Sequence, residues 1–449
     1  MDKEKNEVME GYKETEIGVL PADWEVVRLG EVARRMKAGG TPSTSEPLFW
    51  SGGIPFVKVE DVARPGKYLI DTISSITEHG LKNSNAWLVP ENSILLSMYG
   101  TAGEVKISRK EMAISQNVLG IVPNENIFIE FMYYILNWAK NNTLSLITDV
   151  TIFKHFTLAK AKQIIFPLPP LSEQRKIAYV LSTIQKAIEL QDKVIAALRE
   201  LKKSLMRHLF TYGPVPVDQI DRVPLKETEI GMVPEHWEVV RLGEVTLEEK
   251  GAIKIGPFGS QLKKTELTLQ GKKVYGQENV IKNNFLLGNR FIDDVKFQAL
   301  LSFKVNPGDV LLTAMGTIGY AAVFPENAEE GIIDSHLIRI KVNKDKMSPY
   351  FLKLCFSNHK LKEQLNMYGH GVIMKGLNTS IVKSFSIPLP PLPEQHLITH
   401  ILTIVDNKIN IEQNRKSALQ SLFQTMLHLL MTGRVRVKDL EVKEDALRR

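Results

Sequence analysis

The stretch KETEIGVLPADWEVVRLGEV, residues 13–32, returns almost unchanged at residues 226–245. Sixteen of its twenty positions are identical in the two copies, and the four that differ are Val19/Met232, Leu20/Val233, Ala22/Glu235 and Asp23/His236. A second block, PLPPL followed by Glu173-Gln174, starts at Pro167 and recurs at Pro388 with Glu394-Gln395. The chain is therefore two copies of one unit in tandem, and its function should also be double.

The spacing of the two blocks shows where the copies have diverged. Pro167 and Pro388 are further apart along the chain than Trp24 and Trp237, so the second interior is eight residues longer than the first. The interiors themselves barely resemble each other. A copied frame with diverged interiors predicts one scaffold that presents two different surfaces.

The composition is that of an ordinary globular protein. With 449 residues, of which 43% are hydrophobic and 24% charged, the chain is long enough for two or three domains. No apolar run reaches the ~18 residues of a membrane span, and the N-terminus lacks the apolar region of a signal peptide. Cys355 is the single cysteine, which excludes an internal disulfide, fits a reducing cytoplasm and predicts a small buried hydrophobe. The net charge of +6 permits binding to nucleic acid but does not require it.

Each interior predicts a mixed α+β globe around a modest sheet. Residues 56–59 alternate like a strand. Turns at residues 90–93 and 307–309 precede apolar runs that predict buried strands, and each run leads to a Gly-Thr-x-Gly segment, at residues 100–103 and 316–319. Helices are predicted near residues 129–140 and 348–365.

Both proline blocks open a long amphipathic helix. Apolar residues recur there at steps of three and four, which is typical of a coiled-coil seam. The seam comprises Ile177, Leu181, Ile184, Ile188, Ile195, Leu198 and Leu205, with Leu209 beyond, in the first helix, and Ile398, Leu402, Val405, Ile409, Leu419 and Met426, with Leu430 beyond, in the second. Gln191 and Glu412, with Lys416 beside them, interrupt it. Glu173 and Glu394 fall in the first turns and suit the helix dipole. Glycines, Gly213 and Gly433, end the helices.

The economical arrangement pairs the two helices antiparallel with a globe at either end. The alternative is that each helix lies on its own globe. Helices of about 35 to 40 residues are roughly 50–60 Å long at 1.5 Å per residue, which corresponds to about 15 base pairs of B-DNA. Such a spacer suits a split target whose two halves differ, because the two globes differ.

The repeated blocks and the segments between them resemble the specificity (S) subunit of type I restriction–modification systems over nearly the whole chain. The resemblance rests on the two WEVVRLGEV openings at Trp24 and Trp237, GGTPS at residues 39–43, WSGGIPF at residues 50–56, the two Gly-Thr-x-Gly segments and the two PLPPL blocks. It implies a target-recognition domain over residues 1–165, a linker and second target-recognition domain over residues 214–386, helical regions over residues 166–213 and 387–437, and a charged tail over residues 438–449.

The resemblance also implies partners. They are double-stranded DNA, two modification subunits that carry S-adenosylmethionine and methylate adenine, and restriction subunits in the full complex. This chain would bind no cofactor or metal, would catalyse nothing, and would act in the cytoplasm.

Two other functions remain open from the residues alone. One is a fused enzyme that methylates DNA by itself, although the sequence has no Gly-x-Gly-x-x-Gly and no Asn-Pro-Pro-aromatic motif. The other is a coiled-coil adaptor that never meets nucleic acid. The Glu-x-Lys pairs, such as Glu200–Lys202, are attributed to chance, and the ten histidines form no cluster with metal-ligand spacing.

Basic and small polar side chains near glycine-rich turns are candidate DNA contacts, because such side chains bind phosphates and read base edges. They are Lys37, Thr41, Ser43, Thr44, Lys58, Tyr99, Thr101 and Lys154 in the first globe, and Lys250, Lys254, Ser260, Gln261, Lys263, Lys264, Gln277, Asn279, Thr317 and Lys375 in the second. Trp24 and Trp237 are predicted to be packing anchors. Arg28 and Arg241 are predicted to be structural or to face phosphates.

Overall fold

The computed structural model describes residues 10–100, 102–142, 157–369 and 376–442, which form two compact units. Unit 1 comprises residues 1–192 and 414–449, and unit 2 comprises residues 193–413. The expected domain boundaries separate the globes from the helices. The compact units instead group each globe with one half of each long helix, because the helix halves are packed into the globular cores.

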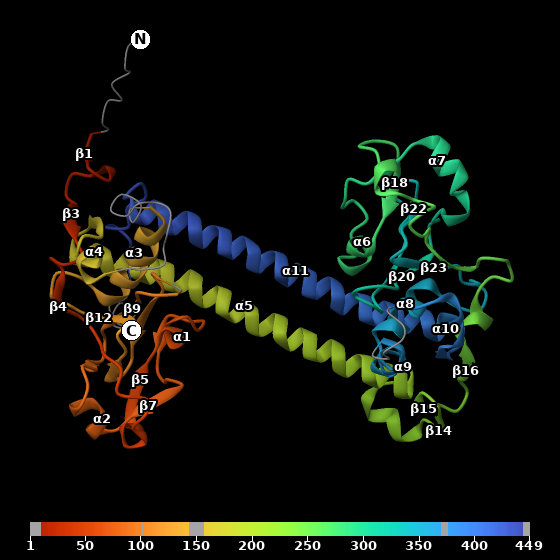
Figure 1. Cartoon of the computed structure of the whole chain (residues 1–449), viewed down its shortest axis with the longest axis horizontal. Helices are drawn as coiled ribbons and strands as arrows, with labels where there is room; N and C mark the ends of the chain where they lie inside the picture. The colour runs from red at the N-terminus through yellow and green to blue at the C-terminus, as the bar shows by residue number, and fades with distance from the viewer. Residues whose placement is uncertain (1–9, 101, 143–156, 370–375, 443–449) are drawn as a thin grey trace, which may run out of the picture. The chain divides into compact units, whose positions relative to one another are not determined.

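Unit 1 is built on two sheets and two small strand pairs (Figure 1). The five-stranded sheet has the order β4 (Ala33–Ala38), β12 (Val118–Pro123), β9 (Ile94–Ser97), β10 (Val105–Ser108) and β6 (Tyr68–Leu69). The four-stranded sheet has the order β7 (Ser74–Ile76), β5 (Trp50–Val57), β11 (Met112–Ile114) and β8 (Trp87–Val89). The pairs are the hairpin β1 (Tyr12–Thr15) with β2 (Gly18–Pro21), and β3 (Glu25–Arg28) with β13 (Ile165–Leu168). The helices are α1 (Val59–Val62), α2 (Glu78–Lys82), α3 (Ile129–Asn142) and α4 (Leu158–Lys162).

Unit 2 repeats this plan with shorter strands. Its sheets have the orders β17 (Ile253–Ile255), β23 (Leu337–Ile340), β20 (Val310–Thr313), β21 (Ala321–Val323), and β19 (Phe291–Ile292), β18 (Lys272–Tyr275), β22 (Gly331–Ile333). The hairpin is β14 (Leu225–Thr228) with β15 (Gly231–Pro234), and β16 (Glu238–Arg241) pairs with β24 (Ser386–Leu389). The helices are α6 (Gln277–Ile281), α7 (Asp294–Ala299), α8 (Pro349–Ser357), α9 (His359–Gly369) and α10 (Thr379–Ser384).

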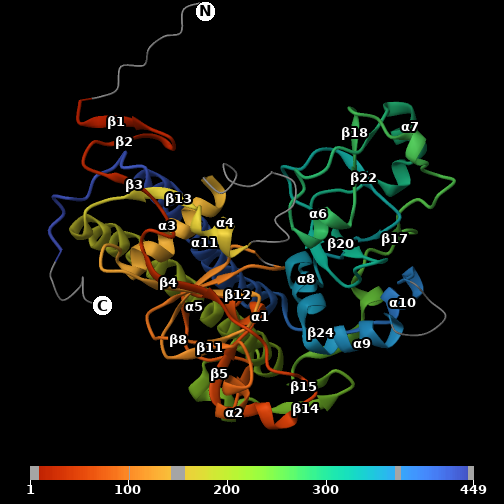
Figure 2. The same ribbon diagram turned by 60° about the vertical axis from the view of Figure 1, so that its left-hand side comes forward.

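In both units the copied hairpin lies at one end and the diverged sheet at the other. Figure 2 shows β1 and β2 far from α2 and β5 in unit 1, and β14 and β15 far from β18 and α7 in unit 2. The same antiparallel register joins the copied blocks, with Arg28 opposite Ile165 and Arg241 opposite Ser386. The duplicated sequence therefore forms the same frame twice, as the repeat predicts.

The two copied tryptophans anchor the cores of their units. Trp24 and Trp237 are 0% exposed, so the prediction of packing anchors is confirmed. Cys355 is 1% exposed within the core of unit 2, and burial raises the pKa of its thiol, which agrees with the prediction of a small buried hydrophobe.

The two long helices are α5 (Leu171–Tyr212) and α11 (Leu392–Met431). In unit 1 the start of α5 packs against the end of α11, because Ile177 and Leu181 share one core with Leu427 and Leu430. In unit 2 the end of α5 packs against the start of α11, where Leu209 shares a core with Ile398 and Leu402. Within each unit the helix halves are thus antiparallel, and each half also packs on its globe.

All thirteen seam residues are buried or half-buried, and the two polar interruptions, Gln191 and Glu412, are buried at 6% and 5% exposure. Charged pairs flank the seam within each unit. Lys416 contacts Asp192 at 2.6 Å in unit 1, and Lys202 contacts Asp406 at 2.6 Å in unit 2.

Two local expectations were wrong. The helix expected over residues 348–365 is broken into α8 and α9, because Asn358 at the end of α8 is extended. The strand expected over residues 56–59 ends at Val57, and α1 begins at Val59, because the Asp61 carboxylate accepts a hydrogen bond from the N–H of Lys58 and stabilises the start of a helix.

Candidate nucleic-acid interface

Four loops of unit 1 meet where the parallel strands β5 and β11 end. The strands are in register at Phe56/Ala113 and Val57/Ile114, so the segments that follow them, residues 58–61 at the start of α1 and residues 115–117, leave the same edge. The N–H of Gly40 donates to the carbonyl of Ile114, and the N–H of Met98 donates to that of Asn117. These bonds bring in the glycine-rich loop, residues 39–44, and residues 98–100, which follow β9. We name these four segments loop cluster 1.

Unit 2 has the same construction at the ends of β18 and β22, which are in register at Val274/Ile332 and Tyr275/Ile333. The N–H of Gly256 donates to the carbonyl of Leu337, and the N–H of Ala314 donates to that of His336. Residues 256–261, 276–279, 314–319 and 334–336 therefore form loop cluster 2.

A glycine at the same place in each cluster permits this close approach. A Cβ on Gly39 would lie 1.8 Å from the carbonyl oxygen of Ile114, and one on Gly256 would lie 2.0 Å from that of Asp334. Both distances are far below van der Waals contact. Only glycine fits, so the two clusters keep one backbone geometry although their side chains differ.

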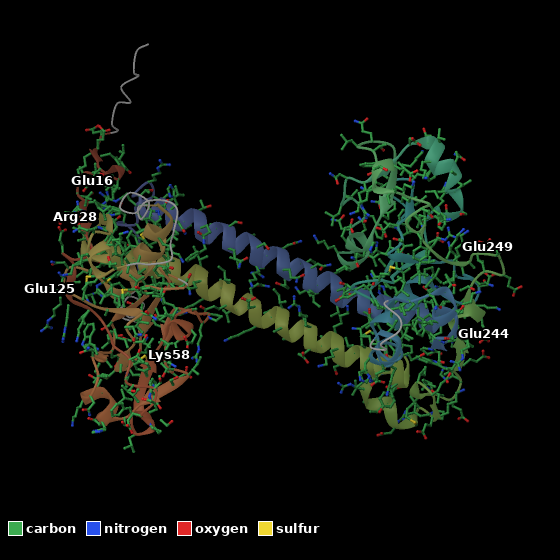
Figure 3. The ribbon with its side chains drawn as sticks, viewed as in Figure 1. Glu16, Arg28, Lys58, Glu125, Glu244 and Glu249 are labelled. Carbon is green, nitrogen blue, oxygen red and sulfur yellow. The ribbon has the colours of Figure 1, made fainter. Side chains whose placement is uncertain are left out.

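Loop cluster 1 presents a cation beside an aromatic ring. The Nζ of Lys58 lies 5.5 Å from the centroid of the Trp50 ring, and the Trp50 indole donates to the carbonyl oxygen of Ser43. The hydroxyl of Thr41 hydrogen-bonds to the Gln116 side chain, which joins two of the loops. Figure 3 shows Lys58 away from the part of unit 1 that carries Arg28, Glu16 and Glu125.

Loop cluster 2 has ion pairs where loop cluster 1 has the Trp50 ring. Arg290 contacts Asp334 at 2.8 Å and Glu278 at 3.1 Å, which ties two loops of the cluster together. Gln277 lies against the Gly316 turn, and its side-chain oxygen is buried with no hydrogen-bond donor among the described residues. His336 is 48% exposed beside Asp334. The two clusters thus offer different donors and acceptors on one framework.

About half of the predicted contact residues come together in these clusters. They are Thr41, Ser43, Thr44, Lys58 and Tyr99 in loop cluster 1, and Ser260, Gln261, Gln277 and Thr317 in loop cluster 2. Lys37 is exposed on β4, just before loop cluster 1, and Lys263 and Lys264 follow the glycine turn of loop cluster 2. Thr101, Lys154 and Lys375 lie outside the described residues.

Three predicted contact residues are engaged within the unit or lie away from loop cluster 2. Asn279 is 1% exposed, and its side chain accepts from the N–H of Gly276 and donates to the carbonyl oxygens of Asn284 and Leu287, so it stabilises the loop. Lys254 places its Nζ 4.3 Å from the Phe303 ring centroid, and burial lowers its pKa. Lys250 precedes β17, at the opposite end of that strand from Gly256.

The loops after β11 and β22 were missed from the sequence. They carry Gln116 and Asn117 in unit 1, and Ser335 and His336 in unit 2. A signal was present, because each loop follows an apolar triplet, Met112–Ile114 in one copy and Gly331–Ile333 in the other. Their sequences share no motif, so only strand pairing reveals that they are equivalent.

The arginines of the copied block are structural. The guanidinium of Arg28 donates to Gln163 at 2.8 Å, and that of Arg241 donates to the carbonyl oxygen of Ser384 at 2.9 Å. Both pair the copied block with the segment that enters the proline block. This agrees with the structural alternative and leaves these side chains engaged within their own units.

Within the described part of the chain, no group of three or more His, Cys, Asp or Glu side chains is arranged to hold a metal ion. No helix among the described residues has both the length and the apolar character needed to cross a bilayer.

Comparison with known proteins gives consistent results. The model of the type I restriction modification DNA specificity domain matches twice, over residues 21–200 and 234–421. Two relatives from Methanocaldococcus jannaschii are each 28% identical and align over 96% of this chain and 97% of their own length. They are described as a putative type I restriction enzyme MjaX specificity subunit and the type I restriction enzyme MjaVIII specificity subunit.

Solved structures share the fold. The crystal structure of a type I restriction–modification S subunit from M. genitalium aligns over 91% of this chain and 96% of its own, with 14% identity and a TM-score of 0.54. A chain from a structure of the type I R-M system aligns over 93% of this chain and 99% of its own, with 17% identity and a TM-score of 0.59. The mixed α/β fold with long helices, predicted from the sequence, is confirmed.

Proposed function

The chain belongs to the family of type I restriction–modification DNA specificity proteins, and from this premise we propose that it reads an asymmetric, two-part DNA target with one half for each unit. The family membership and the DNA-binding specificity role rest on the two matches of the family model and on relatives aligned over nearly their whole length. The two-part reading rests on the loop clusters described above.

The observation that carries the proposal is that one backbone framework is built twice with different side chains. Gly39 and Gly256 occupy the same place, whereas Lys58 beside Trp50 corresponds to Gly276 beside Arg290. Side chains on such loops read base edges in the grooves of DNA, while basic side chains around them bind phosphates. Different side chains on one framework are expected to read different bases.

The recognition domains of this proposal are residues 1–165 and 214–386, with the spacer formed by the helical regions, residues 166–213 and 387–437. The helices have 42 and 40 residues, so each is roughly 60 Å long at 1.5 Å per residue. We propose that they pair as one antiparallel coiled coil with a pseudo-twofold axis and so fix the spacing of the two half-sites. The antiparallel packing of the helix halves within each unit supports this.

The helices also carry apolar side chains that face solvent at equivalent positions, counted from the two proline blocks. Leu190 and its equivalent Ile411 are 61% and 59% exposed, and Leu201 and its equivalent Leu422 are 48% and 46% exposed. Exposed apolar side chains repeated on both copies suit two identical partners. We propose that two modification subunits, which would hold S-adenosylmethionine, dock here, and that restriction subunits join the full complex in the cytoplasm.

The test is to map methylated adenines by long-read sequencing in host cells with this gene present and deleted. A split asymmetric motif that disappears on deletion is expected. A chimaera with unit 1 loops 39–44, 58–61 and 115–117 from another family member should change one half of the motif and leave the other half intact. An unchanged motif, or methyl transfer by the purified chain alone, contradicts the proposal.

The spacer is tested separately. Inserting two heptads into α5, with the matching two heptads in α11, keeps the seam in register and lengthens each helix by about 21 Å. The number of unread base pairs between the half-sites should increase. If it stays fixed, the helices do not set the spacing, although the reading of two half-sites could still be correct.

A further inference from the structure

Unit 2 contains a groove of about 1040 Å³ that lies outside loop cluster 2. Its walls are the last three turns of α5, strand β15, the start of α9 and the edge of β24. Loop cluster 2 contributes no residue to it. We name it the basic groove.

One face of α5 forms a long wall of the basic groove. Arg199, Lys203, Met206 and Phe210 follow one another at steps of four, three and four residues, so they share one face over about three helical turns. The first two side chains are basic, and the last two are apolar. A straight, amphipathic wall of this length matches the side of another helix, which presents a stripe of the same period.

The rim of the basic groove is strongly cationic. Its lining includes Arg199, Lys202, Lys203, Arg207, Lys360 and Lys362, against one acidic residue, Glu363. Lys202 is engaged with Asp406 at 2.6 Å, Glu363 contacts Lys360 at 3.6 Å, and Lys203 makes a solvent-exposed contact of 3.9 Å with Glu200. Among the described residues, no ion pair involves Arg199, Arg207 or Lys362. This excess of positive charge favours an anionic occupant.

The floor of the same groove is apolar. It is formed by Phe210, Ile230, Leu361 and Ile387, and Met232 on β15 is 45% exposed at its margin. A DNA backbone would contact the basic rim but leave this apolar surface without a partner, because phosphates and sugars are recognised by polar groups. An occupant must therefore be acidic on one side and apolar on the other.

The duplication provides an internal control. When the two copies are aligned on their proline blocks, Arg199, Lys203 and Arg207 correspond to Gln420, Gln424 and His428 of unit 1, and Lys202 corresponds to Phe423. The corresponding face of α11 thus lacks the lysines and arginines. A partner that binds both copies alike, such as a pair of identical subunits, gives no reason for this difference.

We propose that the basic groove is a docking site for an acidic amphipathic helix of a partner protein, present on unit 2 and not on unit 1. One such helix would bind per chain. Its glutamates or aspartates would pair with Arg199, Lys203 and Arg207, and its apolar stripe would cover Met206, Phe210 and Met232. This site goes beyond the reading of DNA and does not depend on it.

The experiment uses the full chain and a fluorescent synthetic helical peptide of about three heptads, with leucine at the a and d positions, glutamate at the flanking e and g positions and alanine elsewhere. The control peptide carries lysine in place of every glutamate. Fluorescence anisotropy is expected to detect binding of the glutamate peptide and not of the lysine peptide. Equal binding of both peptides, or no binding of the glutamate peptide, overturns the proposal.

Charge reversal locates the site. The variant Arg199→Glu/Lys203→Glu/Arg207→Glu is expected to lose affinity for the glutamate peptide at least ten-fold and to gain binding of the lysine peptide. These three side chains are exposed, so the fold should survive. The matched variant Gln420→Glu/Gln424→Glu/His428→Glu of unit 1 should leave glutamate-peptide affinity within two-fold. Equal loss in both variants overturns the assignment to unit 2.

A DNA occupant is distinguished in the same assay. A mixed-sequence duplex should not displace the glutamate peptide, and the reversal variant in unit 2 should retain non-specific DNA affinity within about three-fold at matched salt, since most phosphate contacts would lie elsewhere. Displacement by the duplex, with a larger loss of DNA affinity in that variant, would identify a nucleic-acid surface and overturn the protein partner.

Discussion

Each unit buries a tryptophan against a glutamate at the start of a long helix, but the charged side chains that contact the glutamate differ between the units. In both, the buried indole of the copied tryptophan donates to a glutamate in the first turn of the long helix, Trp24 to Glu173 at 3.1 Å and Trp237 to Glu394 at 2.9 Å. The side chain of Glu173 is 2% exposed, whereas that of Glu394 is 25% exposed. The deeper carboxylate needs a stronger counter-charge, because burial of an unpaired charge is costly.

Unit 1 obtains that charge from the segment that follows α11. Arg436 contacts Glu173 at 2.8 Å and Asp23 at 2.7 Å, and its guanidinium holds the pKa of Asp23 below its usual range. The hydroxyl of Tyr12 donates to the carbonyl of Gly433 nearby, which ties β1 to the segment that follows α11. In unit 2, Gly213 after α5 lies next to Glu394, and His236, at 2.8 Å, contacts this carboxylate in place of an arginine. Asp23 and His236 occupy the same position of the copied block but have different partners, Arg436 for Asp23 and Glu394 for His236. A single difference in the copied block therefore marks a place where the ion pairs of the two units differ.

The largest effect is expected from Arg436→Met. The substitution leaves Glu173 buried without its cation, which should cost about 3–5 kcal/mol of unfolding free energy in unit 1. Urea unfolding should show a destabilised transition, and hydrogen exchange measured by mass spectrometry should rise in the first turns of α5. His236→Ala is the control in unit 2, where Glu394 is partly exposed, and should cost under about 1 kcal/mol. Equal losses would show that the two carboxylates are equally dependent on their partners.

The sequence repeat made the shared tryptophans and the helix packing predictable. It did not predict which charged side chains become buried or what contacts them. Trp24 and Trp237 were identified as anchors because they are shared, and heptad spacing placed residues such as Leu181 and Leu402 in the helix packing. The role of Glu173 was predicted only as a complement to the helix dipole. Its contact with Arg436 joins residues 263 apart, and no local pattern in the sequence indicates a pairing at that separation.

The candidate site was predictable in part, for a related reason. Glycine turns pointed to Thr41 and Gln277, because turns have local signatures. The third loop of each cluster, with Gln116 or His336, depends on which strands pair in parallel, and pairing is not local. The burial of Asn279 and its hydrogen bonds within the loop were also not predictable, because a polar residue after a glycine turn looks the same in sequence whether it caps a loop or faces a ligand.

A smaller effect, on DNA affinity, is expected when one side chain of a single loop cluster is replaced. Lys58→Ala should weaken recognition of one half-site, and Gln277→Ala that of the other, each by about 1–3 kcal/mol if the side chain contacts a base edge. Anisotropy with duplexes in which each half-site is randomised in turn would assign the halves. Lys250→Ala removes the same charge as Lys58→Ala but lies away from loop cluster 2, and it should change affinity by less than about 0.5 kcal/mol. A uniform loss for both half-sites would indicate phosphate contacts in place of base reading.

The smallest effect is expected from replacing a buried lysine. Each unit buries one lysine, and the surroundings of the two lysines differ. Lys273 of unit 2 is 3% exposed and contacts Glu329 at 3.3 Å, whereas Lys67 of unit 1 is 7% exposed among the rings of Tyr68 and Tyr134, at 4.7 and 5.2 Å. Burial lowers the pKa of Lys67 to about 8, even though Glu130 opposes the shift. The tyrosine faces offset part of the cost of burying the charge, but a carboxylate partner is lacking within hydrogen-bond distance among the described residues.

Lys67→Met should therefore stabilise unit 1 at neutral pH by about 1 kcal/mol, since it removes a charge that burial disfavours. The advantage of the variant shrinks as the pH rises. Between about pH 8 and pH 10.5 the unfolded chain retains the Lys67 proton that the folded protein has lost, so the unfolding free energy of the wild type rises relative to the variant. Paired thermal unfolding at pH 7 and pH 9.5 measures this narrowing. A difference that does not change with pH would mean that Lys67 keeps its proton in the folded state, and that the tyrosine rings stabilise it as well as Glu329 stabilises Lys273.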